Sequence, residues 1–182
     1  IEAGIEAFRA GQFTKLGLDI NGEIVGRPYS IVSAPGESVL EFYFSTVPEG
    51  PLSPRLAALQ AGDIVRVAPK PNGFLVLDEV PPSIHLWLVS TGTGIGPFLS
   101  ILKTPEPWQR FQRVVLVHAV RTADELAYRR TIARIAEVEP KRFAYIPFLS
   151  REAADYALAG RIPQAIGAKL GADKLYDYLK SF

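Results

Sequence analysis

The sequence contains no cysteine, no methionine and only two histidines. Without cysteine there can be no disulfide, no thiolate metal site and no thiol nucleophile. Two histidines without a thiol also leave little material for a zinc or iron centre, so we expect no bound metal. A cysteine-free chain suits a reducing compartment, and we therefore expect a cytoplasmic location.

Long hydrophobic runs and an excess of charge of one sign are also missing. No apolar run approaches the ~18 residues that a membrane span requires, and no signal peptide is visible. The formal net charge is only +1, which gives no reason to expect binding to nucleic acid or to a membrane. With 182 residues, 48% of them hydrophobic and 21% charged, the chain has the composition of an ordinary soluble globular protein of one large or two small domains.

Residues 1–80 have the pattern of an antiparallel β domain. Alternating apolar and polar residues, and runs of aromatic and β-branched ones, are separated by turns that contain glycine or proline. Asn21-Gly22 is a strong hairpin turn. Short strands at this spacing predict a small antiparallel barrel. We expect strands over residues 11–18, 27–33, 40–47, 63–68 and 74–77.

One short helix interrupts this β pattern. Ser53 can act as its N-cap, and Pro54 suits the first helical position. Residues 55–60 favour a helix, and Gly62 ends it. The turn before the helix leaves its N-terminus open, which makes it one candidate site for a phosphate.

Strand-like and helix-like segments alternate over residues 84–182, after the linker Pro81-Pro82-Ser83. This alternation favours a parallel sheet with right-handed crossovers. In such sheets ligands bind beyond the carboxyl ends of the strands. We expect strands over residues 86–90, 114–120 and 143–149, and helices over residues 98–102 and 124–137.

The stretch from Ser90 to Leu102 joins the first of these strands to its helix and contains Gly92, Gly94 and Gly96. Glycine lets the chain turn sharply and lets backbone N–H groups approach a ligand, and a following helix would favour an anion such as a pyrophosphate. The pattern is Gly-x-Gly-x-Gly-Pro, not the Gly-x-Gly-x-x-Gly of the dinucleotide fingerprint, and no suitable ribose-binding acid follows. A plain strand-to-helix turn therefore stays open as an alternative.

Three arginines lie near the ends of the expected strands. Arg121 follows the second strand, Ser150 and Arg151 follow the third, and Arg161 comes soon after. Guanidinium groups match phosphate oxygens in pairs, so these arginines could hold a monophosphate at one edge of the sheet. The alternative is that each is a solvated surface arginine.

Arg27, Tyr29 and Ser30 bring a cation, an aromatic ring and a hydroxyl together in one expected strand. Arg27 and Tyr29 would share a face of that strand, with Ser30 on the other face. The alternative is an edge strand whose arginine and serine only face water. For four other side chains we favour a structural role: packing for Phe42, Tyr43 and Phe44, and burial rather than catalysis for His118. His85 is expected at the surface.

In combination, these motifs resemble the bacterial ferredoxin/flavodoxin–NADP⁺ reductases. The resemblance rests on Arg27-x-Tyr29-Ser30, on Gly50-x-Leu52-Ser53-Pro54-Arg55-Leu56 and on Thr91-Gly-Thr-Gly-Ile-Gly-Pro97, and it spans residues 8–166. It implies an FAD-binding antiparallel barrel over residues 1–80 and a parallel-sheet NADP(H)-binding domain over residues 84–182. It also implies hydride transfer between NADP(H) and FAD, with ferredoxin or flavodoxin as the redox partner.

The resemblance implies a role for particular residues. Arg27 would meet an FAD phosphate, the Tyr29 ring would stack on the isoalloxazine, and Ser30 would lie near flavin N5. Thr93 would lie close to both flavin and nicotinamide, so Tyr29, Ser30 and Thr93 are the expected catalytic residues. Further flavin contacts are expected from Phe44, Ser45, Thr46, Pro51, Leu52 and Ser53. The expected NADP(H) contacts are Val120, Arg121, Ser150, Arg151 and Arg161, with the arginines on the 2′-phosphate, which an acidic residue would repel.

The chain also departs from that family. Residues 1–8 stand where its members usually carry a further barrel strand, and the fourth parallel strand with Cys-Gly-x-Pro, its helix and the C-terminal aromatic residue are missing. A helix from Asp173 could instead turn Leu175, Tyr178 or Leu179, and Phe182 inward. We therefore expect a reductase core that is shortened or re-engineered at both ends. Its uncovered sheet edge would favour self-association.

Two functions are consistent with this sequence. The first is a flavoprotein oxidoreductase of the reductase type. The second is a non-catalytic scaffold or binding module derived from the same core, with weak or no FAD binding. The missing strands favour the scaffold, and the intact flavin motifs favour the enzyme, which we prefer because flavin-binding residues have little reason to persist in a scaffold.

Overall fold

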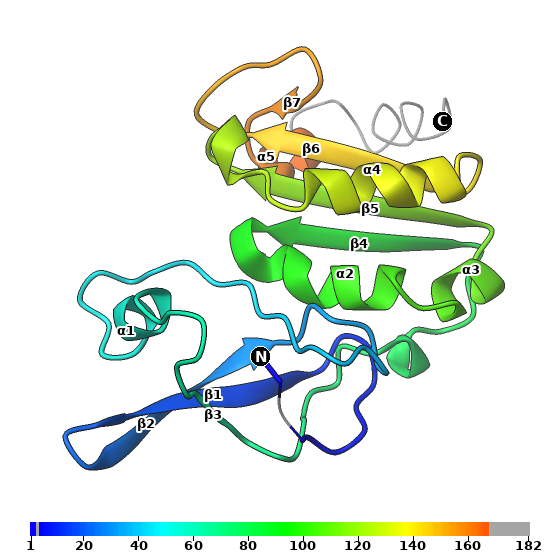
Figure 1. Ribbon diagram of the computed structural model, residues 1–182. Helices are drawn as coiled ribbons and strands as arrows, with labels where there is room; N and C mark the ends of the chain where they lie inside the picture. The colour runs from blue at the N-terminus through cyan, green and yellow to red at the C-terminus, as the bar shows by residue number, and fades with distance from the viewer. Residues whose placement is uncertain (3, 168–182) are drawn as a thin grey trace. The chain divides into compact units, whose positions relative to one another are not determined.

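The computed structural model describes residues 1, 2 and 4–167 (Figure 1). The chain forms two compact units, one of residues 1–81 with 96–106 and the other of residues 82–95 with 107 onward. The first unit holds a three-stranded antiparallel sheet and the second a four-stranded parallel sheet. The predicted fold class, an antiparallel β domain followed by a parallel α/β domain, is confirmed. The division of cofactor binding between residues 1–80 and 84–182 stays a prediction.

A tight hairpin forms the centre of the first unit. β1 (Phe13–Ile20) and β2 (Glu23–Ser30) pair over their whole length, from Phe13 opposite Ser30 to Ile20 opposite Glu23. Asn21 and Gly22 connect them with φ of 56° and 84°, as a two-residue turn with the twist of a hairpin requires. β3 (Arg66–Val67) pairs with the other edge of β1, which gives the order β2-β1-β3.

Two predicted strands of the first unit are wrong, one is shorter than predicted, and the strands predicted over residues 11–18 and 27–33 are shifted to the ranges of β1 and β2. Residues 40–47 form only an isolated bridge between Phe42 and Ile31, and residues 74–77 lead into the 3₁₀ helix η1 (Leu77–Glu79). Of residues 63–68, only β3 is a strand. Strand propensity describes how well side chains fit a pleated, paired surface, and these segments lack a pairing strand along most of their length. Phe42 and Phe44 still pack against the core, as predicted, whereas Phe74 is 83% exposed.

The short helix α1 (Ser53–Ala57) forms, but its cap differs from the prediction. Leu52 occupies the N-cap position, and Pro54 lies in the first turn. The Ser53 hydroxyl oxygen instead accepts the Val47 backbone N–H at 2.9 Å. The Ser53 side chain therefore stabilises the preceding loop and does not cap the helix. The helix also ends earlier than predicted, at Ala57.

Helix α2 (Gly96–Leu102) also belongs to the first unit. The Ser100 hydroxyl donates to the Ser33 carbonyl oxygen at 2.6 Å, with both side chains buried. Lys103, just after the helix, forms ion pairs with Glu37 and Glu41 at 3.6 and 3.7 Å. A Cβ at Gly96 would come within 3.3 Å of Val32, so the third glycine of the turn allows close helix packing rather than only chain reversal.

The second unit is built on a parallel sheet, as predicted, although in the described residues it has four strands rather than the three predicted (Figure 1). They are β4 (His85–Thr91), β5 (Arg113–Val120), β6 (Phe143–Leu149) and the short β7 (Leu158–Ala159), in the order β4-β5-β6-β7. The first three match the predicted ranges within one residue. Their short, unbroken apolar runs are typical of strands buried in a parallel sheet.

The connecting helices are less regular than predicted. The 3₁₀ helix η2 (Gly92–Ile95) follows β4, and α3 (Glu106–Arg110) precedes β5. The predicted helix over 124–137 is split into the 3₁₀ helix η3 (Ala123–Glu125) and α4 (Arg129–Val138). Tyr128 lies between them with φ of 62°, a left-handed conformation that cannot continue a right-handed helix. α5 (Ile162–Gly167) ends the described part of the chain.

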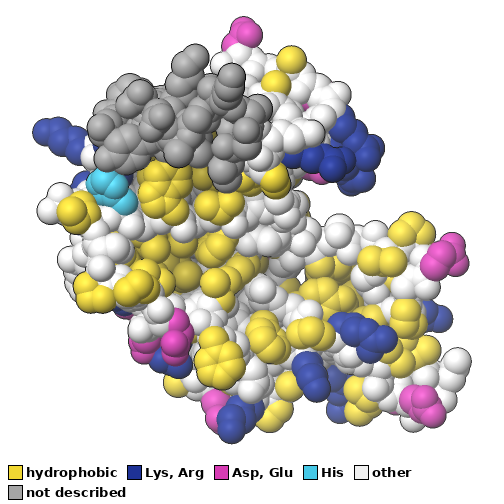
Figure 2. Space-filling view, turned by 180° about the vertical axis from the view of Figure 1, so that it is seen from behind, with side chains coloured by type: hydrophobic (Ala, Val, Ile, Leu, Met, Phe, Trp, Pro, Cys, Tyr) yellow, Lys and Arg dark blue, Asp and Glu magenta, His cyan; other side chains and the backbone are white. Residues whose placement is uncertain are grey.

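Strand β4 has a neighbour on one side only among the described residues. Leu86, Leu88 and Ser90 are buried, whereas Trp87 and Val89, on the other face, are 38% and 47% exposed. Apolar side chains gather over this sheet in the view from behind (Figure 2). Within the described residues β4 thus has one open edge; self-association through it stays a prediction. The helix predicted from Asp173 lies outside the described residues.

Among the described residues, every helix is too short or too polar to cross a bilayer. In that same part of the chain, no group of three or more His, Cys, Asp or Glu residues is arranged to hold a metal ion.

We predict that Gly11→Ala destabilises the first unit far more than Gly22→Ala. Both glycines have positive φ, 98° and 84°, so both alanines carry a left-handed penalty of about 1–2 kcal/mol. Only at Gly11 does a Cβ also collide, 1.8 Å from the Leu75 carbonyl oxygen, whereas nothing lies within 4 Å at Gly22. Urea unfolding should show a loss of about 3 kcal/mol or more for Gly11→Ala. Equal losses for the two variants would contradict this packing.

Candidate functional site

Strand β2 carries Arg27, Tyr29 and Ser30, the first group of predicted site residues. Arg27 is exposed, and its Nη1 donates to the Gly26 carbonyl oxygen at 2.8 Å. The half-buried Tyr29 ring meets the Phe44 ring edge-on, with 5.3 Å between centroids. Burial raises the pKa of the Tyr29 hydroxyl, although Arg27 opposes the shift. The structure thus brings an exposed guanidinium and a supported aromatic ring together on one strand.

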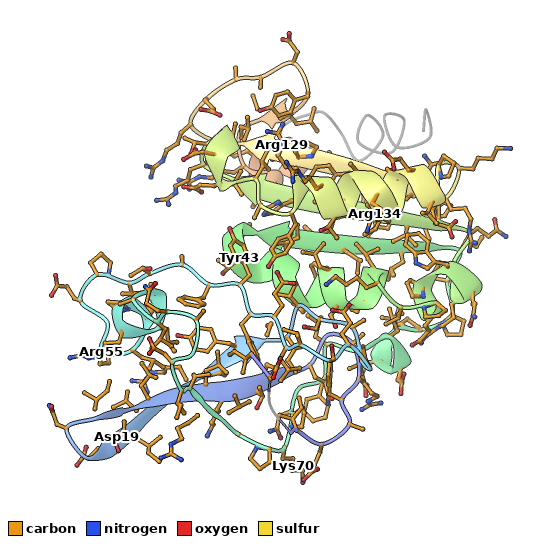
Figure 3. All side chains as sticks on the ribbon, in the orientation of Figure 1. Asp19, Tyr43, Arg55, Lys70, Arg129 and Arg134 are labelled. Atoms are coloured by element: carbon orange, nitrogen blue, oxygen red, sulfur yellow. The ribbon has the colours of Figure 1, made fainter. Side chains whose placement is uncertain are left out.

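The loop between residues 44 and 53 carries the second group. Ser45, Thr46 and Pro51 are exposed, and Leu52 is buried in the core of the unit. Arg55 belongs to α1 (Figure 3), and its Nη1 donates to the Pro51 carbonyl oxygen at 2.7 Å. Together with the bond from Val47 N–H to Ser53, this contact holds the loop in a defined conformation. A rigid loop of exposed backbone suits a polar ligand.

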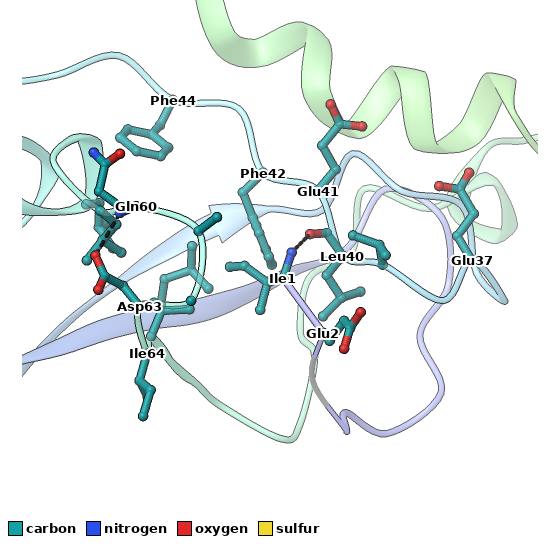
Figure 4. Close-up of a pocket in the computed structure, with 17 residues that line it drawn as sticks. Ile1, Glu2, Glu37, Leu40, Glu41, Phe42, Phe44, Gln60, Asp63 and Ile64 are labelled. Atoms are coloured by element: carbon teal, nitrogen blue, oxygen red, sulfur yellow. Dashed lines mark hydrogen bonds between the residues drawn. The ribbon is translucent and has the colours of Figure 1, made fainter.

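A large cavity of the first unit lies elsewhere. It has a volume of about 880 Å³ and opens between residues 37–44 and residues 59–65 (Figure 4). Its apolar wall includes Leu16 and Phe42, while Glu2, Glu37, Glu41 and Asp63 contribute carboxylates and no lysine or arginine lines it. The lining therefore offers no guanidinium or lysine ammonium to bind a phosphate. Of the predicted site residues only Phe44 lines this cavity, so it is not a pyrophosphate site.

The glycine turn follows the carboxyl end of β4. Gly92 has φ of 51°, and neither Gly92 nor Gly94 has an atom closer than 4.0 Å to a Cβ built on it. Thr93 is half-buried in η2. The space around the first two glycines is therefore open, as the approach of a ligand to the backbone requires.

The arginines of the second unit lie where the sequence predicts, beyond the ends of adjacent strands. The Ser150 N–H donates to the Val120 carbonyl oxygen at 3.0 Å, and the Arg151 N–H donates to the Arg121 carbonyl oxygen at 2.9 Å. The ladder between β5 and β6 thus continues for two residues and sets Arg121 beside Arg151. The Gly160 N–H bonds to the Leu149 carbonyl oxygen at 2.8 Å, which brings the chain before Arg161 to the same end of β6.

These three arginines differ in their freedom to bind an anion. The Arg121 guanidinium is paired with Glu125 through Nε and Nη2, both 2.7 Å from the same carboxylate oxygen. This bond lowers the pKa of Glu125. Arg151 and Arg161 are exposed, and neither forms an ion pair within residues 1, 2 and 4–167. They are the stronger candidates for a phosphate.

Two residues at this edge were not predicted. Glu125 neutralises part of the Arg121 charge, and its i,i+4 spacing from Arg121 is a pattern that could have revealed it. The Glu152 carboxylate accepts the Ala123 N–H and so ties the turn after β6 to the start of η3. That contact joins residues far apart in sequence, and no local pattern indicates it. Nearby, Arg129 stacks on the Tyr156 ring at 5.1 Å (Figure 3).

His118 is packed inside the second unit, as predicted, and His85 is exposed. The His118 side chain is fully buried, with Nε2 at 2.9 Å from the Gly92 carbonyl oxygen and Nδ1 at 3.5 Å from the Tyr145 hydroxyl. Burial lowers the pKa of His118, and the bond to Gly92 opposes the shift. Burial also raises the pKa of Tyr145 to about 12, so the phenol stays protonated.

Comparison with known proteins identifies a domain and its relatives. The oxidoreductase NAD-binding domain family matches residues 88–178. A flavodoxin/ferredoxin–NADP reductase of Escherichia coli is 49% identical over 166 residues, which are 91% of this chain and 67% of that protein. A ferredoxin–NADP reductase of Pseudomonas aeruginosa is 42% identical over 152 residues, 80% of this chain and 59% of the relative. The chain thus spans about two thirds of the length of the first of these relatives.

A solved structure agrees with both sequence matches. It is a ferredoxin NADP⁺ reductase from Neisseria gonorrhoeae, determined with bound FAD and NADP. The TM-score is 0.85 at 34% sequence identity, and the match covers 94% of this chain and 68% of that chain. Both units of this chain therefore have a counterpart in one nucleotide-binding protein.

We predict that stability falls as the pH drops from about 7 to about 5, and that His118 causes part of this fall. Because the pKa of His118 is lowered in the folded state, the unfolded chain binds more protons below its ordinary pKa of about 6.5, and acid favours unfolding. Urea unfolding at several pH values should show a smaller loss of stability with decreasing pH for His118→Gln than for the wild type. An identical slope in wild type and His118→Gln would contradict the assignment.

Proposed function

Because the chain belongs to the flavodoxin/ferredoxin–NADP reductase family, we propose that it binds FAD and NADP(H) and moves electrons between NADP(H) and ferredoxin or flavodoxin. The observation that carries this proposal is the gathering of three arginines beyond the ends of β5, β6 and β7. Family membership also favours the enzyme over a non-catalytic scaffold.

The FAD would be held by the first unit. Arg27 is exposed and retains donors beyond the one bonded to Gly26, so it can take a phosphate. The Tyr29 ring, supported edge-on by Phe44, offers a face on which a planar ring can stack. Ser30 adds a hydroxyl at the end of the same strand, and Ser45, Thr46, Pro51, Leu52 and Ser53 belong to the loop that Arg55 and Val47 fix.

The NADP(H) would be held by the second unit. Arg151 and Arg161 are free of acidic partners in the described part of the chain and suit a 2′-phosphate, with Arg121 contributing less because Glu125 occupies it. Ser150 and Val120 would lie between the arginines, because the Ser150 N–H donates to the Val120 carbonyl oxygen next to them. Thr93 and the open backbone of the glycine turn would face the nicotinamide end.

When bound, FAD and NADP(H) supply the hydride and single-electron chemistry themselves. The chain's part is to bind and orient the two nucleotides and to keep water from the reacting ends. Tyr29, Ser30 and Thr93 are the residues that we assign to this orientation. No side chain of this set is required to donate a proton for hydride transfer.

The redox partner and the location belong to the same proposal. Relatives are named for ferredoxin and flavodoxin, and we propose one of these proteins as the electron partner of this chain. We propose a cytoplasmic location because the sequence holds no cysteine.

We predict that the double variant Arg151→Ala, Arg161→Ala weakens NADPH binding on the order of a hundredfold, while NADH binding changes little. Each arginine would lose a charge-assisted contact to the 2′-phosphate, which NADH does not carry. Isothermal titration with each nucleotide measures the two dissociation constants.

The matched control is Arg130→Ala, Arg134→Ala, which removes the same charge from exposed positions of α4; Arg134 is labelled in Figure 3. It should reduce NADPH binding only a few-fold, through the lost long-range attraction. Equal losses of NADPH and NADH binding in the Arg151, Arg161 variant would remove the 2′-phosphate assignment.

A further inference from the structure

His118 is a buried polar side chain with no part in the function proposed above. It lies in the middle of the sheet on β5, in register with Ser90 of β4 and Pro147 of β6. The side chain has no solvent exposure. Burying an imidazole costs free energy unless its nitrogens find partners, and an apolar side chain would fill the same space without that cost. The partners of His118 therefore need an explanation.

The first partner fixes the tautomer. Nε2 lies 2.9 Å from the Gly92 carbonyl oxygen, and a carbonyl oxygen only accepts, so the proton must be on Nε2. In the neutral ring Nδ1 is then an acceptor. The Tyr145 hydroxyl lies 3.5 Å from Nδ1 and can donate to it, although this distance is long for a hydrogen bond. The bond to Gly92 is the stronger of the two.

The Gly92 carbonyl is part of the glycine turn. A peptide group is planar and trans, so the Gly92 carbonyl oxygen and the Thr93 N–H point in opposite directions. Holding the oxygen against His118 in the protein interior therefore turns the Thr93 N–H outward. Gly92 has φ of 51° with nothing within 4 Å of a Cβ built on it, so no close packing at that position fixes its conformation. A second bond anchors the strand just before it, from the Ser90 hydroxyl to the Val117 carbonyl oxygen at 3.0 Å.

We propose that His118 is a positioning residue that sets the conformation of the glycine turn at Gly92 and Thr93, and so the presentation of Thr93 to the nicotinamide end of NADP(H). Tyr145 supports the ring from the other side. This inference rests on the proposed function, because the function gives Thr93 its task.

Three variants of His118 and one of Tyr145 separate the positioning role from simple packing. The amide nitrogen of glutamine is as many bonds from Cβ as Nε2 of histidine, so His118→Gln keeps a donor for Gly92. The amide nitrogen of asparagine corresponds to Nδ1, so His118→Asn keeps a polar group near Tyr145 but loses the donor to the Gly92 carbonyl oxygen. His118→Leu fills the space with no donor at all. Tyr145→Phe removes the long contact and should have the smallest effect.

The first measurement needs no nucleotide. Since the chain has two histidines, ¹⁵N NMR of the His85→Gln protein reports His118 alone and should show the neutral ring with its proton on Nε2. Amide hydrogen exchange at residues 92–95 should stay near that of the wild type in His118→Gln and rise about tenfold or more in His118→Leu and His118→Asn. A proton on Nδ1, or equal exchange in all variants, would overturn the proposal.

The second measurement is the dissociation constant for NADP⁺. It should remain within about threefold of the wild type in His118→Gln and rise about tenfold in His118→Leu and His118→Asn. A common rise in all three variants would mean that the histidine only fills space, and would overturn the positioning role. If the wild-type protein binds no NADP⁺, the proposed function fails, and the exchange rates alone decide whether His118 positions the turn.

Discussion

The parallel register of β4, β5 and β6 is the constraint on which the candidate NADP(H) site depends. It brings the chain after each strand to one edge of the sheet, and the two backbone bonds beyond β5 and β6 extend that register to Arg121 and Arg151. Like charges repel, so exposed arginines come together only where the backbone holds them. Here the sheet does so, while Glu125 offsets part of the charge at Arg121. A dianionic phosphate bound between the arginines would offset the positive charge that Glu125 leaves uncompensated.

The sequence predicts the second unit better than the first. Short apolar runs give β4, β5 and β6 almost residue by residue, although β4 is buried on one face only. Residues 40–47 look as strand-like as any of these, yet only Phe42 pairs. Their pattern records side-chain burial correctly, but a strand also needs a neighbour, and no local pattern reveals whether one is present.

The same limit applies to the site. The positions of Arg121, Ser150 and Arg151 follow from the rule that ligands bind at strand ends, and the sequence is enough to find them. The pairing of Arg121 with Glu125 and the contact of His118 with Gly92 depend on side-chain directions and on a turn with positive φ. His118 is correctly predicted to be buried, but burial alone says nothing about what its nitrogens hold. For Ser53 the residue type predicts a helix cap, but the hydroxyl accepts the Val47 N–H instead, so the prediction of the contact is wrong.

The central claim is that this chain, at about two thirds of the length of its relatives, binds both nucleotides and lets electrons pass between them. Anaerobic addition of NADPH to the FAD-loaded protein, with the flavin absorbance followed over time, tests it most directly. The account predicts a yellow protein that loses its colour on mixing and regains it when air is admitted. A protein that takes up no FAD, or one that binds both nucleotides and keeps its colour, would contradict the account.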